Sequence, residues 1–417
     1  MAQLNAISIS RYRSFKDEVR LQLAPLVILI GRNGSGKSVI SRLMLLLSEA
    51  FHKGRPNEPL NLRAGGIIHA LSGRDLPHLK GVLPFSLTLE VTHEEKRLEL
   101  QYVLRFIPEK HRITIETCIL KQADKEIVKI SLRNDEQLSV ADPEYVVLVN
   151  GNPHQLQQFC GLMPIFQDGA PSILKDLFGT IADAVPLVSY LGPFRSETGH
   201  FIGSPQYVPQ DLGSRGEHTV EILANNVLRG DGRLQASVSK WLEEKMGHRL
   251  SLHSEDGFSR IALSQLKADA DVSLSETGAG FSQVLPIITQ NFMSQMSLSP
   301  ENFLISEQPE LHLHPAAHGD LADLFISTAQ NNGRSVLIET HSEQLIMRVR
   351  RRIAENVINP EDVVLWSIGH SRQAGESDVR IISLDRTGTP SDWPEGVFEE
   401  SLQDLTALRS AARERGL

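Results

Sequence analysis

The chain has 417 residues, of which 41% are hydrophobic and 22% are charged. This composition excludes a fibrous or wholly disordered protein, and the length predicts two to three domain-sized units or one large domain with insertions. Lys and Arg total 42 against 51 Asp and Glu, for a formal net charge of −9. That balance argues against a passive coat for nucleic acid.

Cysteine usage and hydropathy predict a protein of the cytoplasm. Cys118 and Cys160 are too few for a disulfide framework, which is typical of a reducing compartment. The first residues lack the apolar core of a signal peptide, and the longest apolar runs fall far short of the roughly 18 residues that a membrane span requires. No contact with a membrane is therefore expected.

The N-terminal region predicts strands followed by a glycine-rich turn and a helix. Strands are expected at 6–10 and 19–23, and a third strand at 26–30 is apolar at every position, which indicates burial on both faces. A helix with one apolar face is expected from about Ser38. The segment 52–82 is rich in Gly, Pro and His and predicts a loop.

The middle of the chain predicts an antiparallel lobe and a helical insert. From 85 to 149 apolar and polar residues alternate with period two, which is typical of a meander with one exposed face. Residues 155–183 are predicted to be helical.

The second half predicts an α/β fold with a largely parallel sheet, because short apolar strands alternate with helices. Strands are expected at 185–190, 303–306, 335–338, 363–368 and 379–384, and helices at 217–229, 235–246, 280–296, 316–331 and 342–355.

One segment has the G-x-x-x-x-G-K-S pattern of a phosphate-binding loop, between a buried strand and a helix. Its glycines let successive backbone N–H groups surround phosphate oxygens. Lys37 is expected to reach the β and γ phosphates, and the Ser38 hydroxyl to bind Mg²⁺. The sequence therefore predicts ATP and Mg²⁺ as ligands. The loop residues are Gly31, Arg32, Asn33, Gly34, Ser35, Gly36, Lys37 and Ser38.

Two apolar strands end in residues that complete such a site. A phosphate-binding loop needs an acid at the end of another buried strand to hold the metal, and Glu307 is predicted to do so together with Ser38. His341 follows the next apolar strand and is expected to sense the γ-phosphate.

A hydroxyl-rich turn opens the helix at 280–296, and its free N–H groups suit an anion. The turn is far along the chain from the phosphate-binding loop, so we expect it to face the phosphate of a second subunit. The residues predicted to bind there are Ser275, Gly278, Gly280 and Ser282.

Taken in this order, these motifs resemble an ABC-type ATPase. The near relatives are the RecF, structural-maintenance-of-chromosomes and overcoming-lysogenization-defect proteins rather than the transporters. Short phrases resemble a bacterial family of predicted ATPases: GPFR at 192–195, GEHT at 216–219, GFSQVLP at 280–286, EQPELHLHP at 307–315, ETHSE at 339–343 and the C-terminal DWPEGVF at 392–398.

The resemblance implies an ATPase head that is split in sequence and forms an ATP-sandwich homodimer or a higher assembly of dimers. It also implies a protein effector, such as a nuclease or toxin, in antiphage defence. The alternative is a RecF-like repair ATPase with DNA as its partner. The implied units are the head at 1–84 and 186–345, the β lobe at 85–150, the helical insert at 151–185 and an α/β extension at 346–417.

The chain departs from the ABC pattern at the residue after Glu307. ABC ATPases carry a glutamate there that activates water, whereas this chain has Gln308. An amide cannot accept a proton but can orient a water molecule, so slow hydrolysis and a long-lived ATP-bound dimer are predicted. Glu310 is an alternative base. The turn at 275–282 also lacks the LSGGQ signature of transporters.

Several other features have two readings. The overcoming-lysogenization-defect proteins carry a TOPRIM nuclease, but 76 residues follow His341 and no Asp-x-Asp pair is among them, so no such nuclease is expected.

The histidines after Glu307 have metal-ligand spacing but suit a contact loop better. The arginines near the C-terminus fit a solvated or partner face better than a DNA clamp. Arg195 fits a nucleotide contact or a structural ion pair, and Arg11 and Arg13 fit an adenine or α-phosphate contact. The histidines are His312, His314 and His318, and the arginines are Arg348, Arg350, Arg351, Arg352, Arg409, Arg413 and Arg415.

Overall fold

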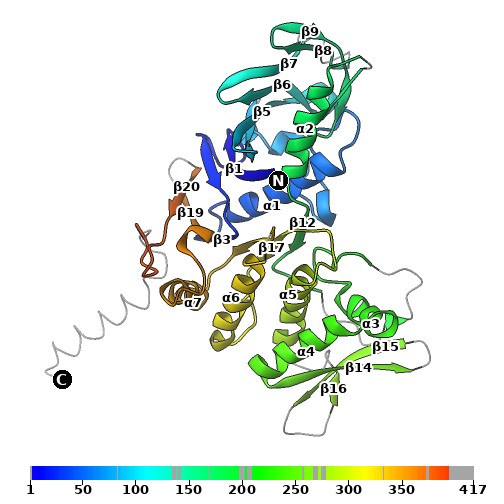
Figure 1. The fold of residues 1–417 in the computed structure, drawn as a ribbon, viewed down its shortest axis with the longest axis vertical. Coiled ribbons are helices and arrows are strands. Elements are labelled where there is room, and N and C mark those ends of the chain that lie inside the picture. Colours follow the sequence, from blue (N-terminus) through cyan, green and yellow to red (C-terminus); the bar gives the residue numbers. More distant parts are fainter. Residues whose placement is uncertain are drawn as a thin grey trace, which may run out of the picture.

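The computed structural model places two large β-sheets side by side, with helices between and beyond them (Figure 1). The predicted α/β class is confirmed. The structure describes residues 2–81, 83–133, 138, 142–167, 169–196, 202–203, 209–255, 258–265, 271–273, 279–331, 333–371 and 375–393.

A six-stranded sheet forms the centre, and its first five strands run parallel. In order across the sheet the strands are β12 (Val188–Leu191), β17 (Phe303–Glu307), β18 (Ser335–Glu339), β3 (Leu26–Gly31), β19 (Val363–Ser371) and β20 (Glu376–Ile382), the last antiparallel to β19. All six residues of β3 are buried. Leu26 and Ile28 enter one hydrophobic core and Val27 and Leu29 the other, which explains why this strand is apolar throughout.

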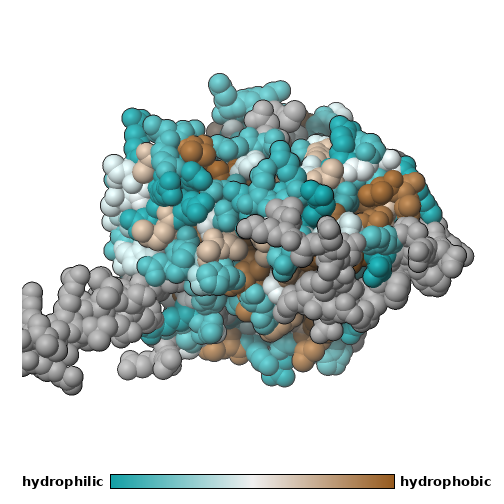
Figure 2. Space-filling view, turned by 90° about the horizontal axis from the view of Figure 1, so that it is seen from below, coloured by the Kyte–Doolittle hydropathy of each residue, from teal (hydrophilic) through white to brown (hydrophobic). Residues whose placement is uncertain are grey.

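Helices cover one face of the central sheet and form the first of these cores. The packed helices are α3 (Thr219–Arg229), α4 (Arg233–Met246), α5 (Ala279–Gln295), α6 (Pro315–Ala329) and α7 (Glu343–Ala354). Figure 2 shows the molecule from the lower end of Figure 1, where the described surface is mainly hydrophilic with small, separate hydrophobic areas. The apolar sides of these helices are thus largely used by the core.

The other face of the central sheet is covered by α1 (Lys37–His52) and an antiparallel sheet. Phe85, Leu87, Leu89 and Val91 alternate with less buried residues and enter the core, as the period-two pattern predicts. In order across the sheet the strands are β2 (Val19–Gln22), β1 (Gln3–Ser10), β4 (Phe85–His93), β5 (Lys96–Ile107), β6 (Arg112–Gln122), β7 (Lys125–Leu132), β8 (Tyr145–Val149) and β9 (Asn152–His154).

The prediction of a helix at 155–183 is wrong in its first half. A hairpin of β10 (Leu156–Cys160) and β11 (Met163–Phe166) precedes the only helix of this segment that the structure describes, α2 (Ser172–Ala184). Gly161 sits in the hairpin turn with φ +59°, and a Cβ there would lie 2.0 Å from the Ala50 carbonyl oxygen. That close approach to the end of α1 requires glycine and a turn, which a continuous helix cannot supply.

A small sheet at 202–273 was not predicted from the sequence. It pairs β14 (His248–Glu255) with β15 (Phe258–Gln265), which also pairs with β13 (Ile202–Gly203) and β16 (Asp271–Ser273). Leu250 and Leu263 of this sheet join the core beside α4.

Short 3₁₀ turns fill most of the remaining connections: η1 (Ala64–Gly66), η2 (Gly73–Asp75), η3 (His78–Lys80), η4 (Pro108–Lys110) and η7 (Pro360–Asp362). Within the described ranges, none of the helices has the length and apolar character required to cross a membrane.

Candidate functional site

The glycine-rich segment joins the end of β3 to the start of α1. Gly31, Gly34 and Gly36 have φ values of +144°, +77° and +106°, a region that favours glycine. A Cβ at Gly31 would lie 2.4 Å from the Ile368 carbonyl oxygen, so no other residue fits there. Gly36 is the N-cap of α1, and no side chain caps this end of the helix. The first amides of α1 are therefore available to an anion.

Lys37 folds back over this loop. Its side chain is 4% exposed, and Nζ donates hydrogen bonds of 2.9 Å to the carbonyl oxygens of Gly31 and Arg32. Burial lowers the pKa of Lys37, and the Glu339 carboxylate partly offsets this effect. The ammonium group is thus held beside the loop amides, where a phosphate would lie.

Two neighbouring segments support the loop from outside. Ser377 of β20 donates from Oγ to the Ser35 carbonyl oxygen at 2.7 Å and from its backbone amide to the Ser14 carbonyl oxygen at 2.8 Å. The Phe15 ring is fully buried, and its edge lies 3.4 Å from where a Gly36 Cβ would be. Arg13 donates to the His69 carbonyl oxygen. The structure therefore ties Arg13 and Phe15 to the fold, whereas Arg11 is exposed.

Glu307 lies at the end of β17 and is 1% exposed. Its Oε1 accepts from Ser41 Oγ at 2.7 Å and Arg42 Nε at 3.0 Å, and its Oε2 accepts from Arg42 Nη2 at 3.0 Å. The Arg42 guanidinium also lies 5.9 Å from the centroid of the Tyr190 ring. Burial disfavours its charge, but the Glu307 carboxylate outweighs burial and raises the pKa of Arg42. Glu307 thus contacts α1 one turn beyond Ser38.

Glu339 lies beside Glu307, because β17 and β18 pair in register at these two residues. It is 4% exposed, and its Oε2 accepts from Ser38 Oγ at 3.0 Å. Burial, reinforced by the negative charge of Glu307, raises the pKa of Glu339 to about 7. Glu339 was not among the site residues predicted from the sequence, although an acid ending the apolar strand next to β17 was a usable signal.

The predicted catalytic residues surround these strand ends. Gln308 has φ +46°, and its backbone N–H donates to the Glu339 backbone carbonyl oxygen at 2.7 Å. Glu310 accepts from the His341 amide at 2.6 Å, and burial raises the pKa of its carboxyl group. Desolvation and the Lys37 charge lower the pKa of His341, whose side chain is exposed. Together with Glu307, these three residues lie at the same sheet edge as the phosphate-binding loop.

Arg195 supports the turn after β17 from within the protein. It is 3% exposed, and its Nη2 donates to the Glu307 carbonyl oxygen at 2.9 Å. Burial lowers the pKa of Arg195 to about 10. Its backbone exchanges hydrogen bonds of 3.4 Å with the Gln283 side chain of α5. These contacts favour a structural role for Arg195 over a nucleotide contact, but they are hydrogen bonds to carbonyl and amide groups rather than the expected ion pair.

The hydroxyl-rich turn is only partly described. Ser275 and Gly278 lie outside the described residues, whereas Gly280 and Ser282 are in the first turn of α5. A Cβ at Gly280 would lie 3.0 Å from the His312 carbonyl oxygen, so glycine lets α5 approach the loop after β17 closely.

Two of the histidines that follow Glu307, His314 and His318, have structural contacts. His318 Nδ1 lies 2.8 Å from Ser342 Oγ, and its Nε2 lies 3.3 Å from the Leu313 carbonyl oxygen. His314 Nδ1 accepts from the Ala316 amide at 3.2 Å and caps α6. In the described part of the chain, no group of three or more His, Cys, Asp or Glu residues is arranged to hold a metal.

The arginines of α7 are paired within the chain. Asp323 of α6 accepts from Arg348 at 2.6 Å and from Arg352 at 2.7 Å. Arg351 bonds to Glu355 at 2.7 Å, and Arg350 donates to the Gly388 carbonyl oxygen at 2.7 Å. Residues 409–415 lie outside the described ranges.

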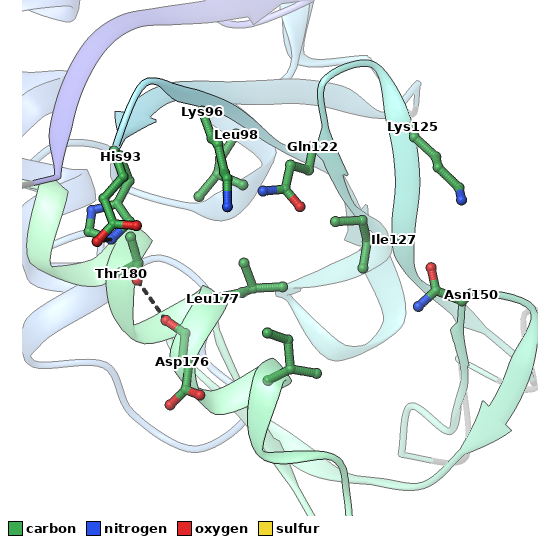
Figure 3. A pocket seen from close by; sticks show the side chains of 12 residues that line it. His93, Lys96, Leu98, Gln122, Lys125, Ile127, Asn150, Asp176, Leu177 and Thr180 are labelled. Carbon is green, nitrogen blue, oxygen red and sulfur yellow. Dashed lines mark hydrogen bonds and ion pairs between the residues drawn. The ribbon is translucent and has the colours of Figure 1, made fainter.

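A separate cavity of about 490 Å³ lies in the antiparallel lobe. It is lined by α2 and by the ends of the β4–β5, β6–β7 and β8–β9 hairpins (Figure 3). Lys96, Gln122 and Asn150 approach it from the strands, and Asp176 and Leu177 from the helix. It shares no residue with the strand-end site.

Comparison with known proteins gives a family match and structural similarities. Residues 216–346 match the family described as AAA ATPase domain. No curated protein matches the chain. The structural-maintenance-of-chromosomes (SMC) head domain from Thermotoga maritima is 12% identical, covers 92% of this chain and 99% of its own, and has a TM-score of 0.43.

Further SMC heads are similar at the same level. One bound to the C-terminal winged-helix domain of ScpA is 12% identical, covers 92% of this chain and 98% of its own, and has a TM-score of 0.46. Another, from Pyrococcus furiosus, has an extended coiled coil and is bound to the C-terminal domain of ScpA. It is 11% identical, covers 98% of this chain and all of its own, and has a TM-score of 0.44.

The family match spans α5, the ends of β17 and β18, and His341, but not the phosphate-binding loop. The parallel sheet places that loop against the matched segment. The fold is of the P-loop ATPase class, and the family match over residues 216–346 supports an ATPase.

Proposed function

We propose that the chain binds ATP with Mg²⁺ and hydrolyses it slowly, as an ABC-type ATPase. The observation that supports this best is convergence: the phosphate-binding loop, Glu307, Glu339 and His341 come from three parallel strands and meet at one sheet edge. Open α/β sheets bind ligands at this edge, beyond the carboxyl ends of their strands.

The residues present fit Mg·ATP. The loop glycines adopt the positive φ values that let the backbone curl around an anion, and the uncapped start of α1 offers backbone donors to phosphate. Lys37 supplies a buried positive charge beside them. Ser38 with a strand-end carboxylate supplies the hard oxygen ligands that Mg²⁺ prefers. When bound, the metal neutralises charge on the β and γ phosphates.

Slow hydrolysis follows from the residues around the expected position of the attacking water. Gln308 orients this water without accepting its proton. Glu310 is the candidate base, but its carboxylate already accepts the His341 amide at 2.6 Å. Glu310 therefore also positions His341. Because its carboxylate is already engaged in this hydrogen bond, we expect it to accept a proton from water inefficiently.

Nucleotide binding is the test of this proposal. Isothermal titration of ATP into the full chain should give saturable binding, and Lys37→Ala should weaken it by about 100-fold or more because a buried charge-assisted contact is lost. Lys53→Ala is the matched control, since Lys53 lies at the opposite end of α1 and is 71% exposed at its side chain. Equal affinities for both variants and the wild type would refute the assignment.

We further infer an ATP-sandwich dimer, in which the turn at 275–282 of one subunit faces the phosphate-binding loop of the other. The first turn of α5 bonds through Gln283 to Arg195, which bonds to the Glu307 carbonyl oxygen. A contact on that turn would therefore reach the strand-end carboxylates. Light scattering should detect a dimer that requires ATP and is lost in Lys37→Ala.

A protein effector, such as a nuclease or toxin in antiphage defence, is the partner that the family resemblance implies. The pairing of Arg348 and Arg352 with Asp323 supports a protein partner, because these arginines are not free to clamp a phosphate backbone. A filter-binding assay with a salt titration tests this choice. DNA binding that appears only with ATP and weakens steeply as salt rises would instead support the RecF-like repair ATPase.

A further inference from the structure

Two carboxylates meet at the proposed metal position. Glu307 and Glu339 pair in register at the ends of adjacent parallel strands, and both side chains are almost completely buried. Like charges held this close in a buried site repel each other unless each has a compensating cation. The cation available to each carboxylate therefore decides its role.

Glu307 has its cation within the chain. The Arg42 guanidinium donates a hydrogen bond to each carboxylate oxygen, and Ser41 donates a further hydrogen bond to Oε1. For Glu307 to bind a metal ion, it would have to leave a bidentate pair that is planar and charge-assisted. The freed Arg42 would then remain beside the Tyr190 ring without a carboxylate.

Glu339 is placed differently. Its Oε2 accepts a hydrogen bond from the Ser38 hydroxyl, and in the described part of the chain no lysine or arginine is in ion-pair contact with it. The Lys37 charge acts on Glu339 and lowers its pKa, but Lys37 Nζ is bonded to the carbonyl oxygens of Gly31 and Arg32. This buried carboxylate therefore lacks a dedicated cation.

The spacing between Ser38 and Glu339 fits a shared Mg²⁺ ion. Their oxygens are 3.0 Å apart, and adjacent ligands of an octahedral Mg²⁺ ion with bonds of 2.0–2.1 Å are about 2.9 Å apart. The Ser41 hydroxyl that contacts Glu307 lies nearly a turn further along α1, past the loop.

We propose that Glu339, and not Glu307, is the carboxylate that binds Mg²⁺ together with Ser38 when ATP is present. The Glu307–Arg42 pair then fixes α1 against β17 and keeps the second carboxylate neutralised. This inference rests on the proposed nucleotide site and changes which strand end supplies the metal ligand.

The test compares ATP affinity in Mg²⁺ with affinity in EDTA, by isothermal titration on the full chain. Wild type should bind ATP at least about tenfold more tightly with Mg²⁺. Glu339→Gln should lose most of this enhancement while keeping its affinity in EDTA, and Glu307→Gln should keep the enhancement. If Glu339→Gln keeps it and Glu307→Gln loses it, the assignment is overturned.

A second readout does not depend on nucleotide affinity alone. Electron paramagnetic resonance of Mn²⁺ with ADP should show tight binding of one ion by the wild type and weakened binding by both Glu339→Gln and Ser38→Ala. The loss in the double variant should be clearly smaller than the sum of the two single losses, because the two oxygens share one ion. Additive losses would overturn the shared-ion arrangement.

Controls separate this inference from the proposed function. Thermal melting without nucleotide should show that Glu339→Gln folds, and Ser38→Ala gives a second route if it does not. Wild-type binding that is equally tight in Mg²⁺ and EDTA refutes the metal assignment but leaves the nucleotide site standing. No ATP binding by wild type, or equal ATP affinity of wild type and Lys37→Ala, refutes the proposed function itself.

Discussion

The two large sheets of this protein differ in where they concentrate chemistry. The parallel sheet brings the ends of β3, β17 and β18 to one edge, where a lysine, two carboxylates and a histidine meet. The antiparallel sheet has a cavity of about 490 Å³, but its lining mixes cations, anions and apolar side chains from three hairpin ends and α2 (Figure 3).

Strand direction therefore locates the candidate site better than the presence of a cavity does. Parallel strands deliver their carboxyl ends to the same edge, whereas hairpins distribute strand ends to both edges of a sheet. If the comparison is right, damage at the parallel edge should change nucleotide binding, and damage in the antiparallel lobe should change only stability.

The largest expected effect on stability comes from breaking the pair that supports the parallel edge. Arg42→Met leaves Glu307 buried without its cation, so we expect a loss of about 3–5 kcal/mol in the free energy of unfolding. Urea denaturation would measure it. Arg351→Ala is the control, because its pair with Glu355 is on the surface and its loss should leave stability essentially unchanged.

The double variant Arg42→Met, Glu307→Leu sharpens this result. Replacing both charges with apolar side chains removes the buried unpaired carboxylate, so much of the stability should return. A double variant that is less stable than Arg42→Met would contradict the view that the penalty comes from an uncompensated Glu307.

The next effect depends on pH and distinguishes Glu339 from Glu307. Burial raises the pKa of Glu339 from an ordinary value near 4.5 to about 7. The native state therefore binds more protons than the unfolded state between these values, so stability falls as pH rises through this range. In the absence of nucleotide and metal, Glu339→Gln should be more stable than wild type near pH 8 by at most about 3 kcal/mol.

Denaturation of both proteins from about pH 4 to pH 8 checks this expectation, because the difference should vanish at the acidic end, where both states of wild type are protonated. Parallel stability curves for the two proteins would mean that Glu339 has another partner.

The third effect is in the antiparallel lobe. The buried Tyr102 hydroxyl donates to the Leu162 carbonyl oxygen at 2.7 Å, and Tyr102→Phe leaves that carbonyl group unsatisfied. We expect a loss of about 1–2 kcal/mol with no change in ATP affinity. Tyr145→Phe should cost less, because its bond to the Ile115 carbonyl oxygen is longer, at 3.1 Å, and only partly buried. A change in ATP affinity in either variant would contradict the expectation that damage in the antiparallel lobe changes only stability.

The parallel edge was largely predictable from sequence because its signals are local. The glycine-rich loop, the acid after one apolar strand and the histidine after the next each lie within a few residues of the strand that presents them. Such patterns report strand ends directly.

The pairing of charges at that edge was not predictable. Glu307 bonds to Arg42 and Glu339 to Ser38, partners 265 and 301 residues away in sequence. Which acid meets which partner depends on the register of β17 against β18 and on the rotation of α1, and neither is encoded locally. The hairpin at 156–166 was missed for a similar reason, since Gly161 is explained by its contact with the Ala50 carbonyl oxygen.

The smallest expected effect tests the lobe cavity itself. Lys96 and Ile173 line it from opposite sides and are exposed, so the double variant Lys96→Ala, Ile173→Ser should change stability by less than about 1 kcal/mol. ATP affinity should stay within about twofold of wild type, because the lining residues come from α2 and from hairpin ends of the antiparallel sheet and none belongs to the proposed nucleotide site. Titration of ATP into this variant is the measurement. A change in ATP affinity of about tenfold would mean that α2 and the hairpin ends are energetically coupled to the nucleotide site. The coupling would pass through α1, whose side chains share a hydrophobic core with theirs. The two sheets would then act as one unit, and the lobe cavity would have to be counted with the nucleotide site.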